Sequence, residues 1–339
     1  MTLSGVHTGI TYTKSPLARV REIAAEASPF FVFDTNTRPL LPAADEESFT
    51  VPAGEKFKNW DTAAEIAREL LERGTARDGL IVAAGGGVVC DLVAFLASIY
   101  MRGMRLVLVP TSLLAMVDAS IGGKTGIDFG GYKNILGSFY PAEEVVVSSG
   151  FLETLPEREY LNGMAEVIKH ALLADGELYR LLREERQRVL DRDTVVLDEI
   201  LHRSLEVKAR YVEEDPKERG IRGHLNLGHT FGHALESVSG LSGRSHGEAV
   251  AWGIAKAMAA GAEMGITDPD YAREVTELLD DYGYQISGTG VDPDEIIAAT
   301  AYDKKKQCGT VRFILQEGRE RTLFSPVPRE VLKKVLRDG

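Results

Sequence analysis

Short apolar runs alternate with helix-like patterns in the first half of the chain. Runs of four to six mostly apolar residues predict buried strands, at 30–34 (FFVFD), 79–87 (GLIVAAGGG), 105–112 (RLVLVPTS) and 143–149 (EEVVVSS). Helical periodicity fills the intervals at 62–73 and 90–103, and the pair Thr62 and Glu65 predicts a capping box, with Gly74 at the other end. Strands separated by helices predict a parallel, Rossmann-like α/β sheet whose ligands bind at the carboxyl ends of the strands.

The second half of the chain has a different pattern. From Phe151 onward almost every segment has helical spacing, and only VRFIL at 311–315 predicts a strand. We therefore expect two domains, an α/β domain over 1–150 and a mainly α-helical domain over 151–339.

Composition excludes several classes of partner. The formal net charge is −12, from 39 basic and 51 acidic residues, which argues against nucleic acid and anionic membranes. Neither a signal-peptide pattern nor an apolar run of about 20 residues is present, and the two cysteines, Cys90 and Cys308, are not in a metal or redox spacing. The sequence predicts a cytoplasmic protein.

Histidines concentrate in one stretch of the second half. Four of the seven, His224, His229, His233 and His246, fall between residues 222 and 250. His229 and His233 are four residues apart, so a helix places both rings on one face, and His246 opens the next apolar helix. Imidazoles at facing helix ends suit zinc, although two histidines one turn apart are more often simply polar residues on a helix.

A carboxylate from elsewhere in the chain would strengthen the metal hypothesis. Glu166 and Lys169 lie three apart on an otherwise apolar helical segment, where they form either an ordinary intrahelical ion pair or part of a metal site. Lys208 and Arg222 would add cations to such a site, or are solvated surface charges.

Two glycine-rich segments are candidates for binding anions. Residues 83–91 (AAGGGVVCD) join a strand to a helix, where backbone N–H groups can meet a phosphate, or they form only a tight turn. Residues 110–134 carry Asp118, Lys124, Lys133 and Asn134 in what we predict to be a long loop, either functional or a solvated surface loop.

Together these stretches resemble the 3-dehydroquinate synthase family, within the sugar-phosphate cyclases. The matching segments, which run almost continuously from Gly85 to Gly253, are GGGVVCDLVAFLASIYMRG, VPTSLLAMVDASIGGKTGID, KNILGSFYPAEEVVV, FLETLP, NGMAEVIKHALL, RGHLNLGHTFGHALE and SHGEAVAWG. The resemblance implies a homodimeric enzyme that uses NAD and Zn2+ or Co2+. It implies conversion of 3-deoxy-D-arabino-heptulosonate 7-phosphate to 3-dehydroquinate and phosphate, a step of the shikimate pathway.

The resemblance also implies roles for individual residues. The implied metal ligands are Glu166, His229 and His246, while His233 corresponds to an active-site histidine that is not a ligand. The implied substrate contacts are Lys124, Asn134, Lys169, Lys208, Arg222 and Asn226, with Asp118 as an active-site carboxylate and Arg102 reaching the phosphate from the dimer partner. The implied NAD contacts are Asp34, Asn36, Glu55, Lys58, Gly86, Gly87, Val88, Asp91, Thr111, Ser112, Lys133, Phe151, Leu152, Glu153 and Thr154. The motif does not single out which of Lys304, Lys305 and Lys306 contacts phosphate.

Some positions depart from the family pattern. Cys90 stands where glycine is usual, Gly126 where alanine is common, and GGYKN at 130–134 replaces Pro-x-Gly-Lys-Asn. Arg222, Leu225 and Asn226 fit the dehydroquinate branch better than cyclases that make inosose or valiolone. The alternatives are an aminodehydroquinate synthase, a metal-dependent polyol dehydrogenase of similar fold and a non-catalytic scaffold.

Overall fold

The computed structural model divides the chain into two compact units. It describes residues 1–3, 5, 7–25, 28–42, 48–239, 244–304 and 311–337, with the backbone alone for 301–304. Unit 1 comprises Met1–Tyr160 and Leu197–Arg219, and unit 2 comprises Leu161–Val196 and Gly220–Gly339. The predicted division into two domains near residue 150 stays a prediction. No helix among the described residues is both long enough and apolar enough to span a bilayer.

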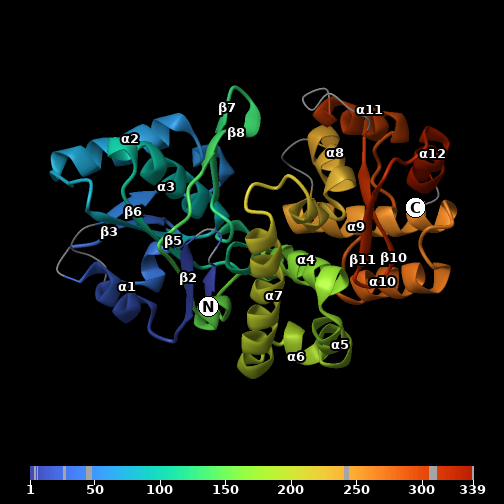
Figure 1. Cartoon of the computed structure of the whole chain (residues 1–339), viewed down its shortest axis with the longest axis horizontal. Helices are drawn as coiled ribbons and strands as arrows, with labels where there is room; N and C mark the ends of the chain where they lie inside the picture. Colours follow the sequence, from blue (N-terminus) through green and yellow to red (C-terminus); the bar gives the residue numbers. More distant parts are fainter. Residues whose placement is uncertain are drawn as a thin grey trace. The chain divides into compact units, whose positions relative to one another are not determined.

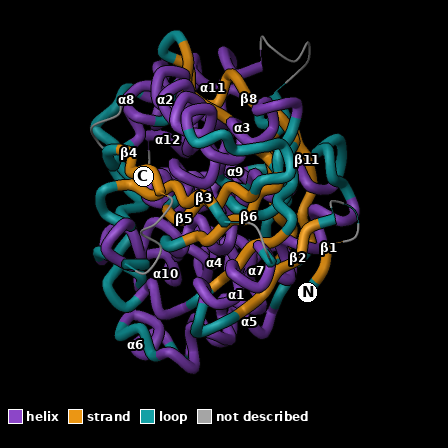
Figure 2. Tube along the Cα trace, turned by 90° about the vertical axis from the view of Figure 1, so that its left-hand side faces the viewer, coloured by secondary structure: helices purple, strands orange, loops and turns teal. Residues whose placement is uncertain are grey.

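A mostly parallel sheet forms the centre of unit 1. Among the described residues it has seven strands in the order β1-β2-β9-β6-β5-β3-β4, and only β1 and β2 pair antiparallel. Figure 2 shows β4, β3, β5, β6, β2 and β1 following one another across this sheet. The strands are β1 (Thr2–Leu3), β2 (Thr8–Tyr12), β3 (Phe30–Asp34), β4 (Ser48–Val51), β5 (Leu80–Gly85), β6 (Arg105–Pro110) and β9 (Glu144–Val147). The four predicted strands are confirmed as β3, β5, β6 and β9.

Helices cover both faces of this sheet. Helices α2 (Trp60–Glu72) and α3 (Gly87–Ile99) lie on one side of the sheet and α1 (Pro16–Ala24) on the other (Figure 1). Every residue of β5 is buried, as a central parallel strand covered on both faces requires. The predicted capping box at Thr62 is wrong. Asn59 is the N-cap, and its side chain accepts a hydrogen bond from the Thr62 backbone N–H at 2.9 Å.

The predicted long loop at 110–134 is largely ordered structure. A π-helical turn spans Ala115–Ala119, and strands β7 (Lys124–Phe129) and β8 (Tyr132–Phe139) form an antiparallel hairpin. Phe129 pairs with Tyr132, so the turn consists of Gly130 and Gly131, whose φ angles are +60° and +82°. Positive φ at both central residues suits glycine and the right-handed twist of a hairpin. The prediction failed because β8 is largely exposed and neither strand carries an alternating apolar pattern.

Unit 2 is mainly helical and is built around one apolar helix. Helix α9 (His246–Glu263) packs against α8 (His229–Ser239), α10 (Pro269–Asp281), α12 (Arg329–Arg337) and β10 (Phe313–Gly318). The other elements are α4 (Glu157–Ala174), α5 (Gly176–Glu184), α6 (Arg186–Leu190), α11 (Pro293–Lys304) and β11 (Arg321–Ser325), while α7 (Thr194–Glu214) lies mostly in unit 1. The expectation of a single strand is wrong, because β11 pairs with β10 as a hairpin.

An ion pair ties α1 to the sheet of unit 1. Arg19 donates to both carboxylate oxygens of Glu144, at 2.7 and 2.8 Å, and the Glu144 side chain is only 12% exposed. Hydrogen bonding to this guanidinium holds the pKa of Glu144 below its usual range. Arg19 also pairs with Glu22 at 3.0 Å, but that carboxylate is 66% exposed.

Glu144→Gln should therefore lower the free energy of unfolding by about 1–2 kcal/mol at pH 7, because hydrogen bonds to charged groups contribute about 1.5–3 kcal/mol and solvent at the 36% exposed Arg19 side chain reduces this. Because the pKa is lowered in the folded state, this stabilisation is present above the unfolded value of about 4.3 and is lost as the pH falls through the folded value. Urea unfolding should show the difference from the native protein shrinking below about pH 4. Glu22→Gln is the control and should change stability by under about 0.5 kcal/mol; equal effects of the two substitutions would contradict the argument.

Candidate metal centre and dinucleotide-binding edge

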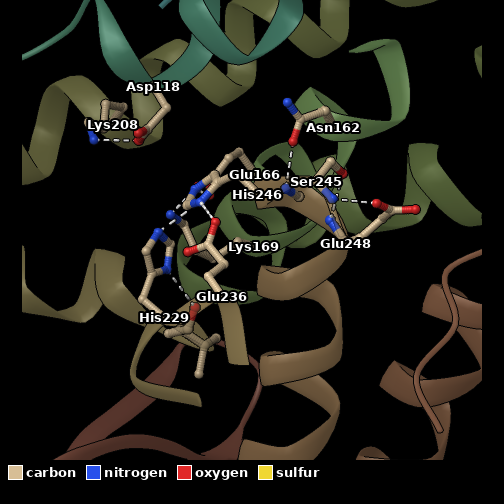
Figure 3. A network of polar contacts seen from close by, with 12 residues as sticks. Asp118, Asn162, Glu166, Lys169, Lys208, His229, Glu236, Ser245, His246 and Glu248 are labelled. Carbon is tan, nitrogen blue, oxygen red and sulfur yellow. Dashed lines mark hydrogen bonds and ion pairs between the residues drawn. The ribbon is translucent and has the colours of Figure 1, made fainter. Parts of the chain in front are cut away.

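Three helices of unit 2 bring one carboxylate and two imidazoles together. Glu166 comes from α4, His229 from the start of α8 and His246 from the start of α9 (Figure 3). The Nε2 atoms of His229 and His246 lie 3.6 and 3.4 Å from the same Glu166 oxygen, Oε1. One ligand atom from each residue lies within 4.8 Å of the others.

Local structure at the start of α9 fixes the position of His246. Ser245 is the N-cap and forms a capping box with Glu248, so the helix begins at His246. The Gly247 N–H donates to Asn162 Oδ1 at 2.5 Å, which ties this helix end to α4. A side chain on Gly247 would come within 2.7 Å of the Asn162 Cα and closer still to its carbonyl oxygen, so only glycine permits this approach.

The charges in this cluster are buried and mutually dependent. The side chains of Glu166 and Lys169 are 0% and 1% exposed, and they form an ion pair. Burial alone would raise the pKa of Glu166, but Lys169, His229 and His246 outweigh burial and hold that pKa well below its usual value. Burial lowers the pKa of His229 well below its usual value, while Glu166 and Glu236 overcome burial to raise the pKa of His246 to about 10.

These residues fit a divalent metal of the zinc type. Glu166 Oε1 is buried and has no hydrogen-bond partner, although two imidazole nitrogens point at it. His229 Nδ1 lies 3.3 Å from the Leu227 carbonyl oxygen, which favours a proton on Nδ1 and a lone pair on Nε2. Two imidazoles and one carboxylate form the donor set of catalytic zinc sites that keep a fourth position open.

The carboxyl ends of the unit 1 strands form a second candidate site. Asp34 ends β3, Gly86 follows β5, and Thr111 and Ser112 follow β6, so they share one edge of the sheet. Gly86 is the N-cap of α3, where N–H groups and the helix dipole favour a phosphate. A Cβ atom on Gly86 would lie 3.5 Å from Ser112 Oγ, so the absence of a side chain leaves the strand ends open.

A buried ion pair lies beside the start of α3. Lys58 Nζ is 2.5 Å from Asp91 Oδ2, and the two side chains are 5% and 20% exposed. Burial lowers the pKa of Lys58, but Asp91 outweighs burial and raises it, so the ammonium stays charged.

The remaining predicted NAD contacts have varied exposure. Asn36 lies in the turn after β3, where its N–H donates to Asp34 Oδ1 at 2.9 Å. Glu153, Thr154 and Lys133 are exposed, whereas the side chains of Phe151 and Leu152 are buried. Partly buried positions at the site are Glu55, Gly87 and Val88.

The predicted substrate contacts in unit 1 include two paired lysines. Lys208 Nζ lies 2.5 Å from Asp118 Oδ1, a pair also drawn in Figure 3, and Asp118 sits in the π-helical turn, a feature common at functional sites. Lys124 forms an ion pair with Glu218. Two further predicted contacts, Arg102 and Asn134, are exposed and have positive φ angles of +68° and +51°.

Unit 2 holds the other predicted contacts. Arg222 is buried and Asn226 partly buried in a 3₁₀ segment, Ile221–Asn226, just before α8. His233 is exposed, one turn after His229. The backbone of Lys304 ends α11, while Lys305 and Lys306 lie outside the described residues.

Three partner residues were not found from the sequence. Glu236 faces His246 Nδ1 at 3.6 Å, Asn162 accepts from Gly247, and Glu218 pairs with Lys124. Only Glu236 had a signal, because it lies three residues after His233 and seven after His229, on the same face of the predicted helix.

Comparison with known proteins identifies the family. Residues 48–162 match the model described as 3-dehydroquinate synthase N-terminal, and residues 163–306 match 3-dehydroquinate synthase C-terminal. A 3-dehydroquinate synthase from Dehalococcoides mccartyi is 45% identical over 265 residues, 78% of this chain and 74% of that protein. The chain belongs to the 3-dehydroquinate synthase family. A 3-dehydroquinate synthase from Sulfurovum sp. is 38% identical over 333 residues, 93% of this chain and 94% of that protein.

Solved structures agree on the fold. A 2-epi-5-epi-valiolone synthase from Streptomyces hygroscopicus, with NAD+ and Zn2+ bound, has a TM-score of 0.89 at 28% identity and covers 98% of this chain and 96% of its own. A 2-deoxy-scyllo-inosose synthase complexed with carbaglucose-6-phosphate, NAD+ and Co2+ has a TM-score of 0.84 at 23% identity, covering 97% and 96%. The predicted fold class, an α/β part and a mainly helical part of the dehydroquinate synthase type, is confirmed.

Proposed function

We propose that this protein is a 3-dehydroquinate synthase that converts 3-deoxy-D-arabino-heptulosonate 7-phosphate to 3-dehydroquinate and phosphate. Membership of the family supports the reaction. The observation that carries the proposal is the convergence of His229 and His246 on the otherwise unsatisfied oxygen of Glu166. The cofactors that we propose are NAD and a divalent metal, Zn2+ or Co2+.

The ligand set and the strand edge have separate roles in this proposal. Glu166, His229 and His246 hold the metal, which when bound supplies Lewis acidity to substrate oxygens. Residues 86–88, the N-cap and first residues of α3, would hold NAD, which would supply reversible hydride transfer without net redox change. Lys58 and Asp91 fix the first turn of α3 beside that turn.

The cations of the chain bind the two anionic groups of the substrate. Lys124, Lys208 and Arg222 are the proposed contacts for phosphate and carboxylate, together with Lys169, Asn134, Asn226 and His233. The short Lys208–Asp118 pair orients the ammonium before substrate arrives, which limits the reorganisation that binding requires. Charge-assisted hydrogen bonds from individual basic side chains allow a chain of net negative charge to bind an anion.

A phosphate-release assay tests the proposal. The purified protein with heptulosonate phosphate, catalytic NAD and added Zn2+ should release one phosphate for each dehydroquinate formed, without net NADH. Turnover only of an amino-substituted substrate would identify an aminodehydroquinate synthase. Net NADH production from a polyol, without phosphate release, would identify a dehydrogenase instead.

The proposal includes a cytoplasmic homodimer. The β7–β8 hairpin exposes four large apolar side chains, Phe129, Tyr132, Ile135 and Phe139, each between 46% and 57% exposed. Within the described residues β8 pairs only with β7, so its outer edge offers a strand that a second copy can meet antiparallel across a two-fold axis. Exposed apolar surface on such an edge supports a subunit interface.

The double substitution Phe129→Asp and Ile135→Asp should convert the dimer to a monomer, because it places charge on a surface that the interface would desolvate. Light scattering after size exclusion measures the mass. Val195→Asp, at a side chain that is 72% exposed on α7, is the control and should leave the dimer intact. A double variant that remains dimeric would place the interface elsewhere.

A further inference from the structure

The imidazole of His246 lies between two carboxylates. Its Nε2 is 3.4 Å from Glu166 Oε1, and its Nδ1 is 3.6 Å from Glu236 Oε1. Glu166 belongs to α4 and Glu236 to α8, so the two carboxylates approach the ring from different helices (Figure 3). The role of Glu166 is already assigned, while that of Glu236 is not.

The tautomer of His246 decides which of its two nitrogen atoms can bind a metal. A neutral imidazole carries one N–H and one lone pair, and a metal takes the lone pair. If Nε2 binds the metal shared with Glu166, the proton must sit on Nδ1, which is the atom facing Glu236. His229 has the same arrangement, since its Nδ1 faces the Leu227 carbonyl oxygen at 3.3 Å.

We propose that Glu236 is a positioning residue for the metal centre, whose carboxylate accepts a hydrogen bond from the Nδ1–H of His246 and thereby presents Nε2 to the metal. This inference rests on the proposed metal set of Glu166, His229 and His246. The carboxylate holds the ring orientation and makes Nε2 a stronger donor, as acceptors behind ligating histidines do in metalloproteins. It also adds a negative charge, so that two carboxylates balance a divalent cation.

Helix α8 supplies both a ligand and this positioning residue. His229 and Glu236 are seven residues apart, two helical turns, and therefore lie on one face. The Glu236 side chain is 23% exposed, which leaves its carboxylate partly shielded and strengthens its electrostatic attraction to the imidazole. Any movement of α8 shifts His229 and the acceptor for His246 together.

A competing arrangement makes Glu236 itself a ligand. His233, Glu236 and His246 also offer atoms within 4.8 Å of one another. The two arrangements predict different behaviour in variants. If Glu236 is a ligand, Glu236→Gln should lose most of the affinity for metal, and Glu166→Ala should still bind it. If Glu236 only positions His246, the amide oxygen of glutamine should largely replace the carboxylate, because it still accepts a hydrogen bond from Nδ1–H.

Metal affinity, measured without substrate, tests the inference. Co2+ is titrated into metal-free protein in competition with a chromophoric chelator, for the native chain, Glu236→Ala, Glu236→Gln and Glu263→Ala. We expect Glu236→Ala to weaken Co2+ binding about 10- to 100-fold, and Glu236→Gln to weaken it less than about 10-fold. Glu263→Ala removes the same charge from the far end of α9 and should leave affinity unchanged.

Three binding results would overturn the inference, and a fourth result comes from thermal melting. The three binding results are an unchanged affinity for Co2+ in Glu236→Ala, equal losses of Co2+ affinity in Glu236→Ala and Glu236→Gln, or retained Co2+ binding in Glu166→Ala. The melting temperatures of metal-free Glu236→Ala and Glu236→Gln should equal that of the metal-free native chain, which separates loss of the acceptor from misfolding of α8. An equal fall in the melting temperature of both variants would also count against the inference. If the native chain binds no Co2+ or Zn2+, the proposed function fails as well, whereas normal binding by Glu236→Ala defeats this inference alone.

Discussion

Replacing Glu166 by glutamine should abolish retention of the metal and slow phosphate release at least about 1,000-fold. A neutral amide is a poor ligand for zinc, and the Lewis acidity lost with the metal corresponds to several kcal/mol of transition-state stabilisation. The substitution also leaves the ammonium of Lys169 buried without its counter-charge, since both side chains are almost fully buried. Metal content after dialysis and initial rates of phosphate release measure the two effects.

Loss of stability could be confused with loss of chemistry in this variant. Removing one partner of a buried ion pair costs about 3–5 kcal/mol, whereas replacing both partners by neutral groups is often nearly neutral. The double variant Glu166→Gln with Lys169→Met should therefore recover stability in urea but not metal or activity. Glu157→Gln, at an exposed position in the first turn of the same helix, should retain all three. A Glu166→Gln enzyme that keeps its metal and its rate would exclude the proposed centre.

Gly247→Ala should disrupt the metal centre without touching a ligand. The added methyl group would meet the backbone of Asn162, whose Cα and carbonyl carbon lie 2.7 and 2.8 Å from the ideal Cβ position. Backbone cannot yield as a flexible side chain does, so the start of α9 must move away from α4 and carry His246 away from Glu166. We expect destabilisation of at least about 1–3 kcal/mol, as for other overpacked sites, and a fall in metal affinity of more than 10-fold.

Gly176→Ala is a suitable control for this substitution. Gly176 begins α5 in the same unit, and the nearest atom to its ideal Cβ is the end of the flexible Glu320 side chain at 3.3 Å. Alanine there should change metal affinity by less than about two-fold. Calorimetric titration with Zn2+ and thermal melting compare the two variants, and equal affinities would show that contact with Asn162 does not set the ligand geometry.

The sequence predicted those parts of the fold that are buried from both sides. Strands β3, β5, β6 and β9 appear as unbroken apolar runs because helices cover both faces of the sheet. The β7–β8 hairpin was predicted as a loop because β8 is largely exposed and the buried residues of β7, 125–127, form one short run without apolar alternation. Asn59 was overlooked as the N-cap of α2 because Thr62 and Glu65 have the spacing of a capping box. The N-cap is instead the residue with non-helical backbone angles directly before the helix, and that residue is Asn59.

The candidate site was only partly accessible to sequence reasoning. Periodicity placed His229 and His233 on one helical face and His246 at a helix start, but local spacing could not select two ligands from three histidines. The carboxylate lies on α4, more than 60 residues before His229 along the chain, so only tertiary structure or family resemblance connects them. Asn162 was missed because a hydrogen bond between two helices leaves no periodic signature, whereas the helical spacing of Glu236 from His229 and His233 was overlooked.

The course of the backbone has a practical consequence for dissecting this enzyme. The chain passes from one compact unit to the other after Tyr160, after Val196 and again after Arg219. Each unit is therefore built from two separate stretches of the chain, so a cut at a single peptide bond cannot yield either unit complete and by itself. Gene fusions, split-protein reporters and circular permutants should consequently be designed around all three crossings, and limited proteolysis should not release either half as a stable, independently folded product.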